Sequence, residues 1–295
     1  MSSAKLLSII LPAYNEAGVV GNVVKSLREA FPDAEILVVN DCSRDSTAEE
    51  AGMAGARVVS HQYNMGNGAA IKTGARQAAG DILVFMDADG QHSAENVRAL
   101  LDKLDAGYDM AIGARDAGSQ ANRRRHVGNS LLNRLASLLT GHKIHDLTSG
   151  FRAAKANVFR QFLYLLPNGF SYPTTSTMAF LRSGYSVAFV PIKVRRRQGS
   201  SKISFLRDGI RFLVIIMKMT TLFSPMRVFF PLSMLFFILG TIRYIYFYWQ
   251  TGGFSNMAGI MFMMSMLIFL IGLVSEQITA LHYGMSHSDC TREED

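Results

Sequence analysis

Residues 82–92 read Ile-Leu-Val-Phe-Met-Asp-Ala-Asp-Gly-Gln-His, an unbroken apolar run that ends in two carboxylates. Such a run is typical of a strand that is covered on both faces by the rest of the chain. Similar runs recur at residues 7–11, 36–39, 57–59, 110–112 and 187–190. Segments that suit helices lie between the earlier runs, at 17–30, 45–54, 67–79 and 94–106. This alternation predicts βαβ units, a mostly parallel sheet and an open, Rossmann-like α/β fold.

Polar residues follow the ends of three of these predicted strands. They are Tyr14-Asn15-Glu16, Asn40-Asp41 and Asp87-Ala88-Asp89. In open α/β sheets the ligand crevice lies outside the carboxyl ends of the strands. We therefore expect the three clusters to converge on one site.

The two aspartates that close the run at 82–86 suit a metal ion. Asp87 and Asp89 lie two residues apart where the chain turns, so both carboxylates can reach one hard cation that also binds a diphosphate. The expected cofactor is Mg²⁺ or Mn²⁺, which would neutralise charge on a departing nucleoside diphosphate and make Asp89 a catalytic candidate. The alternative is an ordinary solvated loop, because D-x-D occurs often by chance.

The other strand-end clusters have the side chains that a nucleotide needs. Carboxylate and amide groups there can hydrogen-bond a base and a ribose, and Tyr14 can cover the face of the base. The glycine-rich segment at 64–68 leads into a helix with Lys72 one turn inside, which predicts a diphosphate contact. For Asp45, Ser46 and Thr47 we favour helix capping over ligand binding.

Net charge and cysteine content narrow the class of protein only in part. The formal charge of +7 favours an anionic partner, which could be nucleic acid, phospholipid or a phosphorylated substrate. The two cysteines, Cys42 and Cys290, lie far apart and predict neither a disulfide framework nor a metal cluster. The N-terminal apolar run stops at Pro12, too early for a signal peptide, so the N-terminal domain is expected to stay in the cytosol.

The C-terminal third differs from the rest of the chain. Residues 228–249 and 257–280 are each long and apolar enough to cross a hydrocarbon core of about 30 Å. We predict a catalytic domain over 1–200, an amphipathic juxtamembrane segment over 201–227, a transmembrane hairpin over 228–280 and a cytoplasmic tail over 281–295. The alternative for the spans is a pair of buried core helices, and for 203–222 a helix that packs on the soluble domain.

Charged residues around the hairpin predict its orientation. Positive charge crowds the N-terminal flank, at Lys202, Arg207, Arg211, Lys218 and Arg227, which places that flank and the catalytic domain in the cytoplasm. The protein is thus expected to be a multi-pass protein of the cytoplasmic (inner) membrane. Arg243 and Glu276 lie near opposite ends of the hairpin, and each should reach its own interface or face a partner helix.

Seven short motifs occur in a fixed order between about residues 7 and 210. They are P-A-Y-N-E, N-D-x-S-x-D-x-T, N-x-G-x-G-A-A-I-K-T-G, D-A-D-x-Q, I-G-A-R, D-x-T-S-G-F-R and R-x-x-G-x-S-K. In this order the chain resembles glycosyltransferase family 2, in the branch of dolichyl-phosphate mannose synthase and bacterial polyprenyl-phosphate glycosyltransferases. The hairpin also matches members that carry their own membrane anchor.

The resemblance implies a GT-A fold, inversion at the anomeric carbon and a set of site residues. Asp87, Asp89 and Gln91 would hold the metal, and the nucleotide would be held by Pro12, Tyr14, Glu16, Asp41, Lys72 and Asp87. Arg115 and Arg152 would be catalytic and would bind phosphate of the donor or acceptor. Ser201 and Lys202 would contact the acceptor phosphate.

Two departures from the family pattern bear on these roles. Asn67 stands where the family usually has lysine in the glycine-rich segment, which leaves Lys72 as the cation there. Many relatives have an acidic residue after a Gly-Phe-Ser-Phe run, whereas this chain continues Tyr172-Pro173-Thr174-Thr175. We expect a changed contact to the sugar or the acceptor.

The nature of the acceptor is inferred from the lack of a recognisable base. A hydroxyl acceptor needs a general base, but neither an E-D motif nor Q-x-x-R-W occurs, and the only tryptophan is Trp249. A phosphate monoester, with a second pKa of about 6, is already ionised at neutral pH. The sequence therefore predicts metal-dependent transfer from a UDP- or GDP-hexose to undecaprenyl or dolichyl phosphate, without a nucleic-acid partner. Alternatives are a hydroxyl acceptor or a non-catalytic nucleotide-binding membrane scaffold, and the hairpin could also support a homo-oligomer.

Overall fold

The computed structural model describes residues 6–115, 130, 133–138, 140–169, 171–192 and 205–290, with side chains throughout except at 205–213, 280 and 282–290. The chain divides into two compact units, Met1–Ile216 and Met217–Asp295. Each unit is described by itself.

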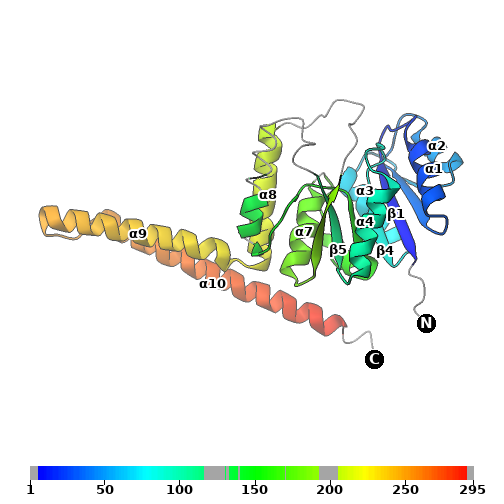
Figure 1. Cartoon of the computed structure of the whole chain (residues 1–295). Coiled ribbons are helices and arrows are strands. Elements are labelled where there is room, and N and C mark those ends of the chain that lie inside the picture. Colours follow the sequence, from blue (N-terminus) through cyan, green and yellow to red (C-terminus); the bar gives the residue numbers. More distant parts are fainter. Residues whose placement is uncertain are drawn as a thin grey trace. The chain divides into compact units, whose positions relative to one another are not determined.

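The first unit is built on one seven-stranded sheet with helices on both faces (Figure 1). Its strands are β1 Leu7–Ala13, β2 Glu35–Asn40, β3 Arg57–Ser60, β4 Ile82–Phe85, β5 Met110–Arg115, β6 Arg152–Lys155 and β7 Val187–Ile192. Its helices are α1 Val20–Ala30, α2 Thr47–Met53, α3 Asn67–Gln77, α4 Ala94–Asp105, α6 Ala156–Gln161, the 3₁₀ turn η2 Leu163–Leu165 and α7 Tyr172–Arg182. The sheet order is β3-β2-β1-β4-β6-β5-β7, and only β6 is antiparallel to its neighbours. The predicted α/β fold with a mostly parallel sheet is confirmed.

Alternation along the strands divides the core into two layers. Ile9 and Leu11 of β1 join a buried apolar cluster with residues of α1 and α4. Ile10, between them, points to the other face, where α3 packs directly against it. Both faces of the strand are therefore buried, which is why β1 is apolar without the polar alternation of a half-exposed strand.

One strand and one helix differ from the sequence prediction. Strand β6 was not predicted; it begins at Arg152, which pairs with Phe85 and Ile112. Helix α7 was not predicted, because its first turns, Tyr-Pro-Thr-Thr-Ser-Thr, consist of residues with modest helix propensity. Tertiary burial overrides that propensity, since all residues from Tyr172 to Leu181 are buried.

The second unit is a helical hairpin of α9 Met226–Thr251 and α10 Asn256–Cys290, preceded by the end of α8 Phe205–Phe223 (Figure 1). Small residues line the contact between the two long helices. The hydroxyls of Ser233 and Ser265 each donate to the other residue's backbone carbonyl at 2.9 Å. Gly240 faces Met261 and Phe262 at a distance that leaves no room for a larger side chain. Close helix approach through small and hydroxyl-bearing residues is typical of membrane hairpins.

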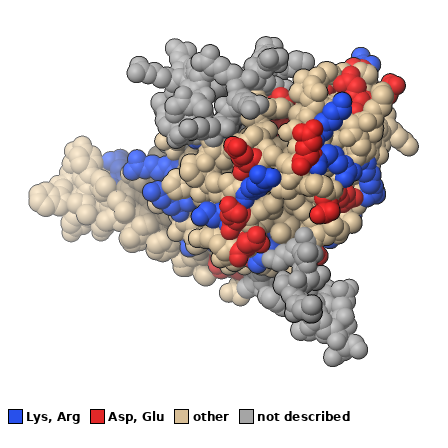
Figure 2. Space-filling view, turned by 45° about the vertical axis from the view of Figure 1, so that its right-hand side comes forward, with Lys and Arg blue, Asp and Glu red and all other residues tan. Residues whose placement is uncertain are grey.

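Both helices have the length and apolar character of membrane spans. The candidate spans are Met226–Thr251 and Asn256–Thr279, and only 11% and 17% of an 18-residue apolar stretch of each is buried within the chain. A core helix of a soluble protein would be mostly buried, so the observed exposure favours a lipid surrounding. Figure 2 shows charges of both signs across the visible face of the first unit, while the far end of the hairpin displays none on that face.

Candidate active site

The candidate site lies at the edge of the sheet where the parallel strands end. Phe85 at the end of β4 is level with Arg152 at the start of β6, and Arg152 is level with Ile112 of β5. The chain segments that leave these points, 86–92, 113–115 and 146–151, therefore meet at one edge. Ala13 and Asn40 end neighbouring strands at the same edge.

The carboxylate motif follows β4 directly. Asp87 and Asp89 are partly exposed, and Gly90 turns the chain with a φ of 73°. Asp89 Oδ1 accepts the backbone N–H of Gln91 at 3.2 Å, which folds the Asp89–Gln91 segment back on itself. Among the described residues no group of three His, Cys, Asp or Glu side chains is placed to hold a metal ion. Two carboxylates and an amide oxygen suit Mg²⁺ or Mn²⁺ only if the remaining ligands are diphosphate or water oxygens.

Gly150 and Tyr172 lie beside Asp87. A methyl group at Gly150 would be 3.2 Å from the Tyr172 hydroxyl and 3.9 Å from Asp87 Oδ2, so the glycine lets both groups approach the backbone. The Tyr172 hydroxyl donates to the carbonyl of Gly150 at 2.9 Å. Burial and the nearby charge of Asp87 raise the pKa of Tyr172, which stays a neutral donor.

Arg115, at the end of β5, is held by an aspartate that the sequence analysis did not select. Its Nε and Nη2 donate to the two carboxylate oxygens of Asp146, at 2.9 and 3.2 Å, and Nη2 also donates to Thr148 Oγ1 at 2.8 Å. Burial alone would lower the pKa of Arg115, but the bond to Asp146 and the charge of Asp87 raise it. Burial would raise the pKa of Asp146, yet Arg115 holds it below its usual range. A fixed positive charge therefore faces Asp87 across the site, with about a third of the Arg115 side chain exposed (35%).

Arg152, predicted to hold phosphate, is completely buried (0% exposed). Its Nη1 donates to Pro173 O at 3.0 Å, Ser176 Oγ at 2.6 Å and Thr177 Oγ1 at 3.2 Å, and Nη2 donates to Ser149 O. Burial lowers its pKa to about 10, which leaves it charged at neutral pH. This guanidinium joins the start of α7 to the segment before β6, and its phosphate contact stays a prediction.

An aromatic stack joins the residue after the D-A-D-x-Q motif to two other sequence motifs. The ring of His92 stacks on Phe151 with centroids 4.3 Å apart and planes inclined by 10°. Behind Phe151 lies Gly113, where a Cβ would be 2.5 Å from the ring and 2.8 Å from Ile192. Burial and the charge of Arg115 lower the pKa of His92 to about 4, so the imidazole is neutral. The stack attaches the turn that carries Asp89 and Gln91 to β5 and β6.

The glycine-rich segment before α3 packs against protein backbone. A Cβ at Gly66 would lie 2.5 Å from Asn168 O, and one at Gly68 would lie 2.1 Å from Pro167 O. Asn168 O also accepts the N–H of Ala69 at 3.1 Å, at the start of the helix. Residues 167–169 therefore occupy the space beside these glycines, and the diphosphate contact of this segment stays a prediction.

Lys72 is engaged by the same loop. Its Nζ donates to Leu166 O at 3.1 Å and to Asn168 Oδ1 at 2.5 Å. Burial, with a smaller effect of Arg76, lowers its pKa. The side chain that was expected to bind diphosphate thus fastens residues 166–168 to α3.

Asp41, after β2, organises the start of the glycine-rich segment. Oδ1 accepts the N–H of Met65 at 2.8 Å and is hydrogen-bonded to His61 Nδ1 at 2.7 Å, while Oδ2 accepts the N–H of Gly66 at 2.8 Å. Asp41 is 4% exposed. Its predicted nucleotide contact remains a prediction, beside a clear structural role in positioning the loop.

The loop after β1 is fastened to the loop after β2. Asn15, in a left-handed conformation with φ of 55°, accepts the N–H of Arg44 at 2.9 Å and donates its own N–H to Ser43 Oγ at 3.0 Å. Tyr14 next to it is 45% exposed, so its ring can cover a ligand. Pro12, near the end of β1, and Glu16, on the loop, flank it. Asp45 accepts the N–H of Thr47 at 3.1 Å, whereas the Ser46 hydroxyl donates to Glu50 and caps no backbone group.

Several functional assignments could not be made from the sequence, and two cannot be examined in the structure. Asp146 and His61 were missed; the aspartate opens the D-x-T-S-G-F-R motif, which was the signal that could have revealed it. Ser201 and Lys202 lie outside the described residues.

Comparison with known proteins identifies both parts of the chain. The family model "Glycosyl transferase family 2" matches residues 8–163, and "GtrB C-terminal hairpin" matches residues 224–281. Glycosyltransferase AglJ of Haloferax volcanii is 31% identical over 96% of each chain. Polyprenol monophosphomannose synthase of Mycolicibacterium smegmatis is 35% identical over 66% of this chain and 80% of the relative, and undecaprenyl-phosphate mannosyltransferase of Micrococcus luteus is 30% identical over 66% and 86%.

A solved structure shares the fold. Glucosyl-3-phosphoglycerate synthase from Mycobacterium tuberculosis, in complex with Mn²⁺, uridine diphosphate and phosphoglyceric acid, superposes with a TM-score of 0.59 at 20% identity, over 74% of this chain and 79% of that one. At this identity the likeness concerns the fold, which is the GT-A fold expected from the sequence.

Proposed function

The chain belongs to glycosyl transferase family 2 and is a glycosyltransferase, and from this premise we propose that it transfers a hexose from a nucleotide-sugar to a polyprenyl phosphate with inversion at the anomeric carbon. The observation that carries the proposal is the convergence of Asp87 and Asp89 with the fixed cation of Arg115 at one edge of the sheet. The names of the similar relatives, which act on polyprenol, dolichyl phosphate and undecaprenyl phosphate, support the acceptor class.

We assign the metal to the carboxylate motif. Asp87, Asp89 and Gln91 would hold Mg²⁺ or Mn²⁺, and when bound the ion would neutralise the charge of the leaving nucleoside diphosphate. The folded-back Asp89–Gln91 turn and its stacked neighbour His92 support this assignment, because they restrict the directions of the donor groups. The relevant solved structure of the same fold was obtained with Mn²⁺.

The nucleotide would lie along the loops after β1 and β2. Pro12, Tyr14 and Glu16 line one side, with the exposed Tyr14 ring available to cover the base, and Asp41 lies beneath the other loop. Lys72 and the glycine-rich segment are left out of the diphosphate site, because they bind residues 166–169. The remaining candidate cation for donor or acceptor phosphate among the selected residues that the structure describes is Arg115.

The acceptor is proposed to attack as an ionised phosphate. At the described edge of the sheet, Asp146 is paired with Arg115, and the Asp41 carboxylate is occupied by hydrogen bonds with Met65, Gly66 and His61, so neither is placed to contact an acceptor hydroxyl. Asp87 and Asp89 are assigned to the metal. A phosphate monoester needs no base, since its second pKa is about 6. Arg115, together with Ser201 and Lys202, would hold it against charge repulsion from the donor.

The hairpin would bring this chemistry to the membrane. We propose that residues 1–200 form the catalytic domain, that 201–227 lie along the membrane surface, that 228–280 span the membrane and that 281–295 return to the cytoplasm. Lys218 and Arg227 near the start of the hairpin support a cytoplasmic location of the catalytic domain, by the excess of positive charge on that side.

The proposal is tested by substituting Asp89. Membranes that contain the full chain would be incubated with radiolabelled UDP- and GDP-sugars and polyprenyl phosphate, with and without Mn²⁺. Asp89→Ala should abolish transfer while leaving the protein folded and membrane-bound. Asp102→Ala, on the exposed surface of α4, is the matched control and should retain full activity.

The product then distinguishes the acceptor class. A glycosyl phosphate is cleaved by mild acid, whereas a glycoside formed on a hydroxyl is stable. An acid-stable product would therefore show that the acceptor is a hydroxyl and not a polyprenyl phosphate. Full activity of Asp89→Ala would contradict the metal assignment.

A further inference from the structure

The two helices of the hairpin are paired along only part of α9. Ser233 and Ser265 are level with one another, as shown by their reciprocal hydrogen bonds. At one end the Glu276 side chain accepts the N–H of Met226. Counting along the antiparallel pair from the Ser233–Ser265 bonds and from the contact of Gly240 with Met261 brings Asn256, the first residue of α10, beside residues 242–245 of α9, and the pairing of the two helices ends there.

The paired part matches the thickness of a bilayer core. From Met226 to Ile242 the helix rises about 25 Å at 1.5 Å per residue, close to the roughly 30 Å of hydrocarbon in a membrane. Polar or charged side chains close both ends, with Arg227 and Glu276 at one and Arg243 and Asn256 at the other. The hydrocarbon core is therefore filled by the paired segment alone.

Helix α9 continues beyond this level for about two turns (Figure 1). We call Ile245–Thr251 the overhang. The chain then turns at Gly252, in a left-handed conformation with φ of 69°, and returns beside the overhang, where Phe254 packs on Tyr244 at 5.6 Å. No residue of α10 lies beside the overhang, because α10 begins at Asn256, further from the tip of the hairpin.

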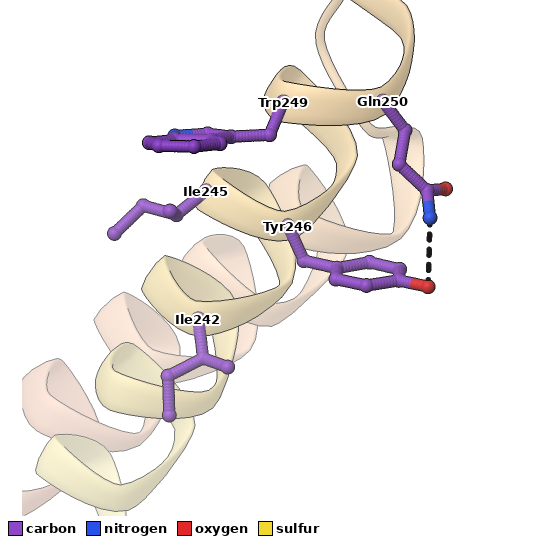
Figure 3. Close-up of a pocket in the computed structure, with 5 residues that line it drawn as sticks. All are labelled: Ile242, Ile245, Tyr246, Trp249 and Gln250. Carbon is purple, nitrogen blue, oxygen red and sulfur yellow. Dashed lines mark hydrogen bonds between the residues drawn. The ribbon is translucent and has the colours of Figure 1, made fainter.

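The exposed surface of the overhang is amphiphilic. Ile245, Tyr246 and Trp249 are 51%, 56% and 86% exposed. Together with Ile242 and Gln250 they line a shallow apolar hollow of about 510 Å³ on the outer side of α9 (Figure 3). The polar atoms gather at one border, where Gln250 Nε2 donates to the Tyr246 hydroxyl at 2.9 Å. Bulky aromatic rings with a polar border suit the boundary between lipid chains and headgroups better than they suit water or hydrocarbon.

Arg243 points toward the same boundary. Its guanidinium carbon lies 5.8 Å from the ring centre of Tyr246 and 5.6 Å from that of Phe247, residues three and four positions further along α9. The guanidinium is therefore shielded by two aromatic faces at this level of the hairpin. A cation at this depth complements the phosphate groups of phospholipids.

We propose that the overhang is an interfacial anchor, which binds the phospholipid headgroup and glycerol region of the leaflet at the hairpin tip, with Arg243 facing lipid phosphate. The anchor would fix how deeply the hairpin sits. The inference rests on the membrane insertion proposed above, but it is independent of the transfer reaction.

Trp249 makes the proposal directly measurable, because it is the only tryptophan in the chain. The full chain would be reconstituted into phosphatidylcholine vesicles whose lipids carry a quencher either close to the headgroup or deep in the acyl chain. We expect the shallow quencher to reduce Trp249 fluorescence more than the deep one. Insertion in either orientation gives the same depth, so mixed orientation does not blur the result.

A matched variant calibrates the measurement. Leu235 lies midway along the paired part of α9 and is 51% exposed. In the double variant Trp249→Phe, Leu235→Trp the order of quenching should reverse, with the deep quencher the stronger. Arg243→Leu should shift Trp249 toward the deep quencher, whereas Arg243→Lys should not.

Three results would overturn the proposal. Stronger quenching of Trp249 by the deep label would place the overhang in hydrocarbon. Quenching by aqueous iodide without quenching by lipid labels would place it in water. Protection from every quencher would mean that a second copy of the chain, rather than lipid, covers the hollow.

Discussion

Replacing Gly68 with alanine should destabilise the N-terminal unit, because the space for a side chain at this position is already filled. A Cβ at Gly68 would lie 2.1 Å from Pro167 O and 2.7 Å from Gly169 O. Since non-bonded atoms are in comfortable contact at about 3.5 Å, residues 167–169 would have to retreat by roughly 1 Å. That shift would stretch the bonds from Ala69 N to Asn168 O and from Lys72 to Leu166 O.

The expected cost is a sum of two effects. Overpacking of a filled site costs about 1–3 kcal/mol, and each weakened hydrogen bond costs up to about 1 kcal/mol. We therefore expect Gly68→Ala to lower the free energy of unfolding by about 2–5 kcal/mol, which corresponds to a Tm lower by roughly 5–15 °C for a unit of this size.

The assay must report on the N-terminal unit of the full chain. Tryptophan fluorescence cannot do so, because Trp249 lies in the hairpin. Resistance of the detergent-solubilised protein to protease after heating follows the unfolding of this unit instead. Gly169→Ala is the control, since a Cβ there meets no atom within 4 Å, and its Tm should match that of the natural chain. An unchanged Tm for Gly68→Ala, combined with weaker binding of nucleoside diphosphate, would refute the packing role of Gly68. It would favour the predicted contact of this segment with diphosphate instead.

Other substitutions test the remaining assignments by the same measurement. The pKa of Asp146 is below its usual range in the folded chain. Its ion pair with Arg115 therefore stabilises the fold fully above the unfolded pKa of about 4, and this stabilisation is lost as the pH falls through the folded pKa. Asp146→Asn should lower Tm at neutral pH and weaken the fall of Tm with pH on the acid side. Arg152→Lys should lower the free energy of unfolding by about 3 kcal/mol, measured without substrate, because lysine cannot donate to the same carbonyls and hydroxyls. An unchanged free energy of unfolding with weaker acceptor binding would instead favour a phosphate contact. His92→Phe should keep or raise Tm, since it preserves the stack on Phe151 and removes a buried Nδ1 that has no hydrogen-bond partner among the described residues. His92→Ala should lower Tm, because the stack is lost. An equal loss of Tm in both variants would mean that the ring nitrogens matter more than the stack.

Local sequence patterns were sufficient to predict the main strands and the two long apolar helices. The run Ile82-Leu83-Val84-Phe85 is apolar throughout because β4 is covered on both faces, and this requirement is visible in the sequence. The spans were equally clear, because length and hydropathy are local properties. Strand β6 was missed because Arg-Ala-Ala-Lys has no strand signature, and it is held as a strand by its neighbours β4 and β5.

The residues of the site were found more readily than their partners. The sequence analysis selected Asp87, Asp89 and Arg115 from motifs, and the structure brings them to one edge of the sheet. It did not select Asp146, which lies 31 residues from Arg115 in the chain and meets it only after folding. Pairing at that separation leaves no periodic pattern for a single sequence to reveal.

The amino-acid sequence by itself determined the open α/β fold, the family, the carboxylate pair and the apolar hairpin, because each depends on a run of neighbouring residues. Only the tertiary structure decided that Arg152 is buried under α7, that Gly66 and Gly68 make room for residues 167–169, and that α9 outruns α10 by about two turns. These features arise from contacts between segments distant in sequence, where the filling of space and the satisfaction of buried polar groups assign a residue its role.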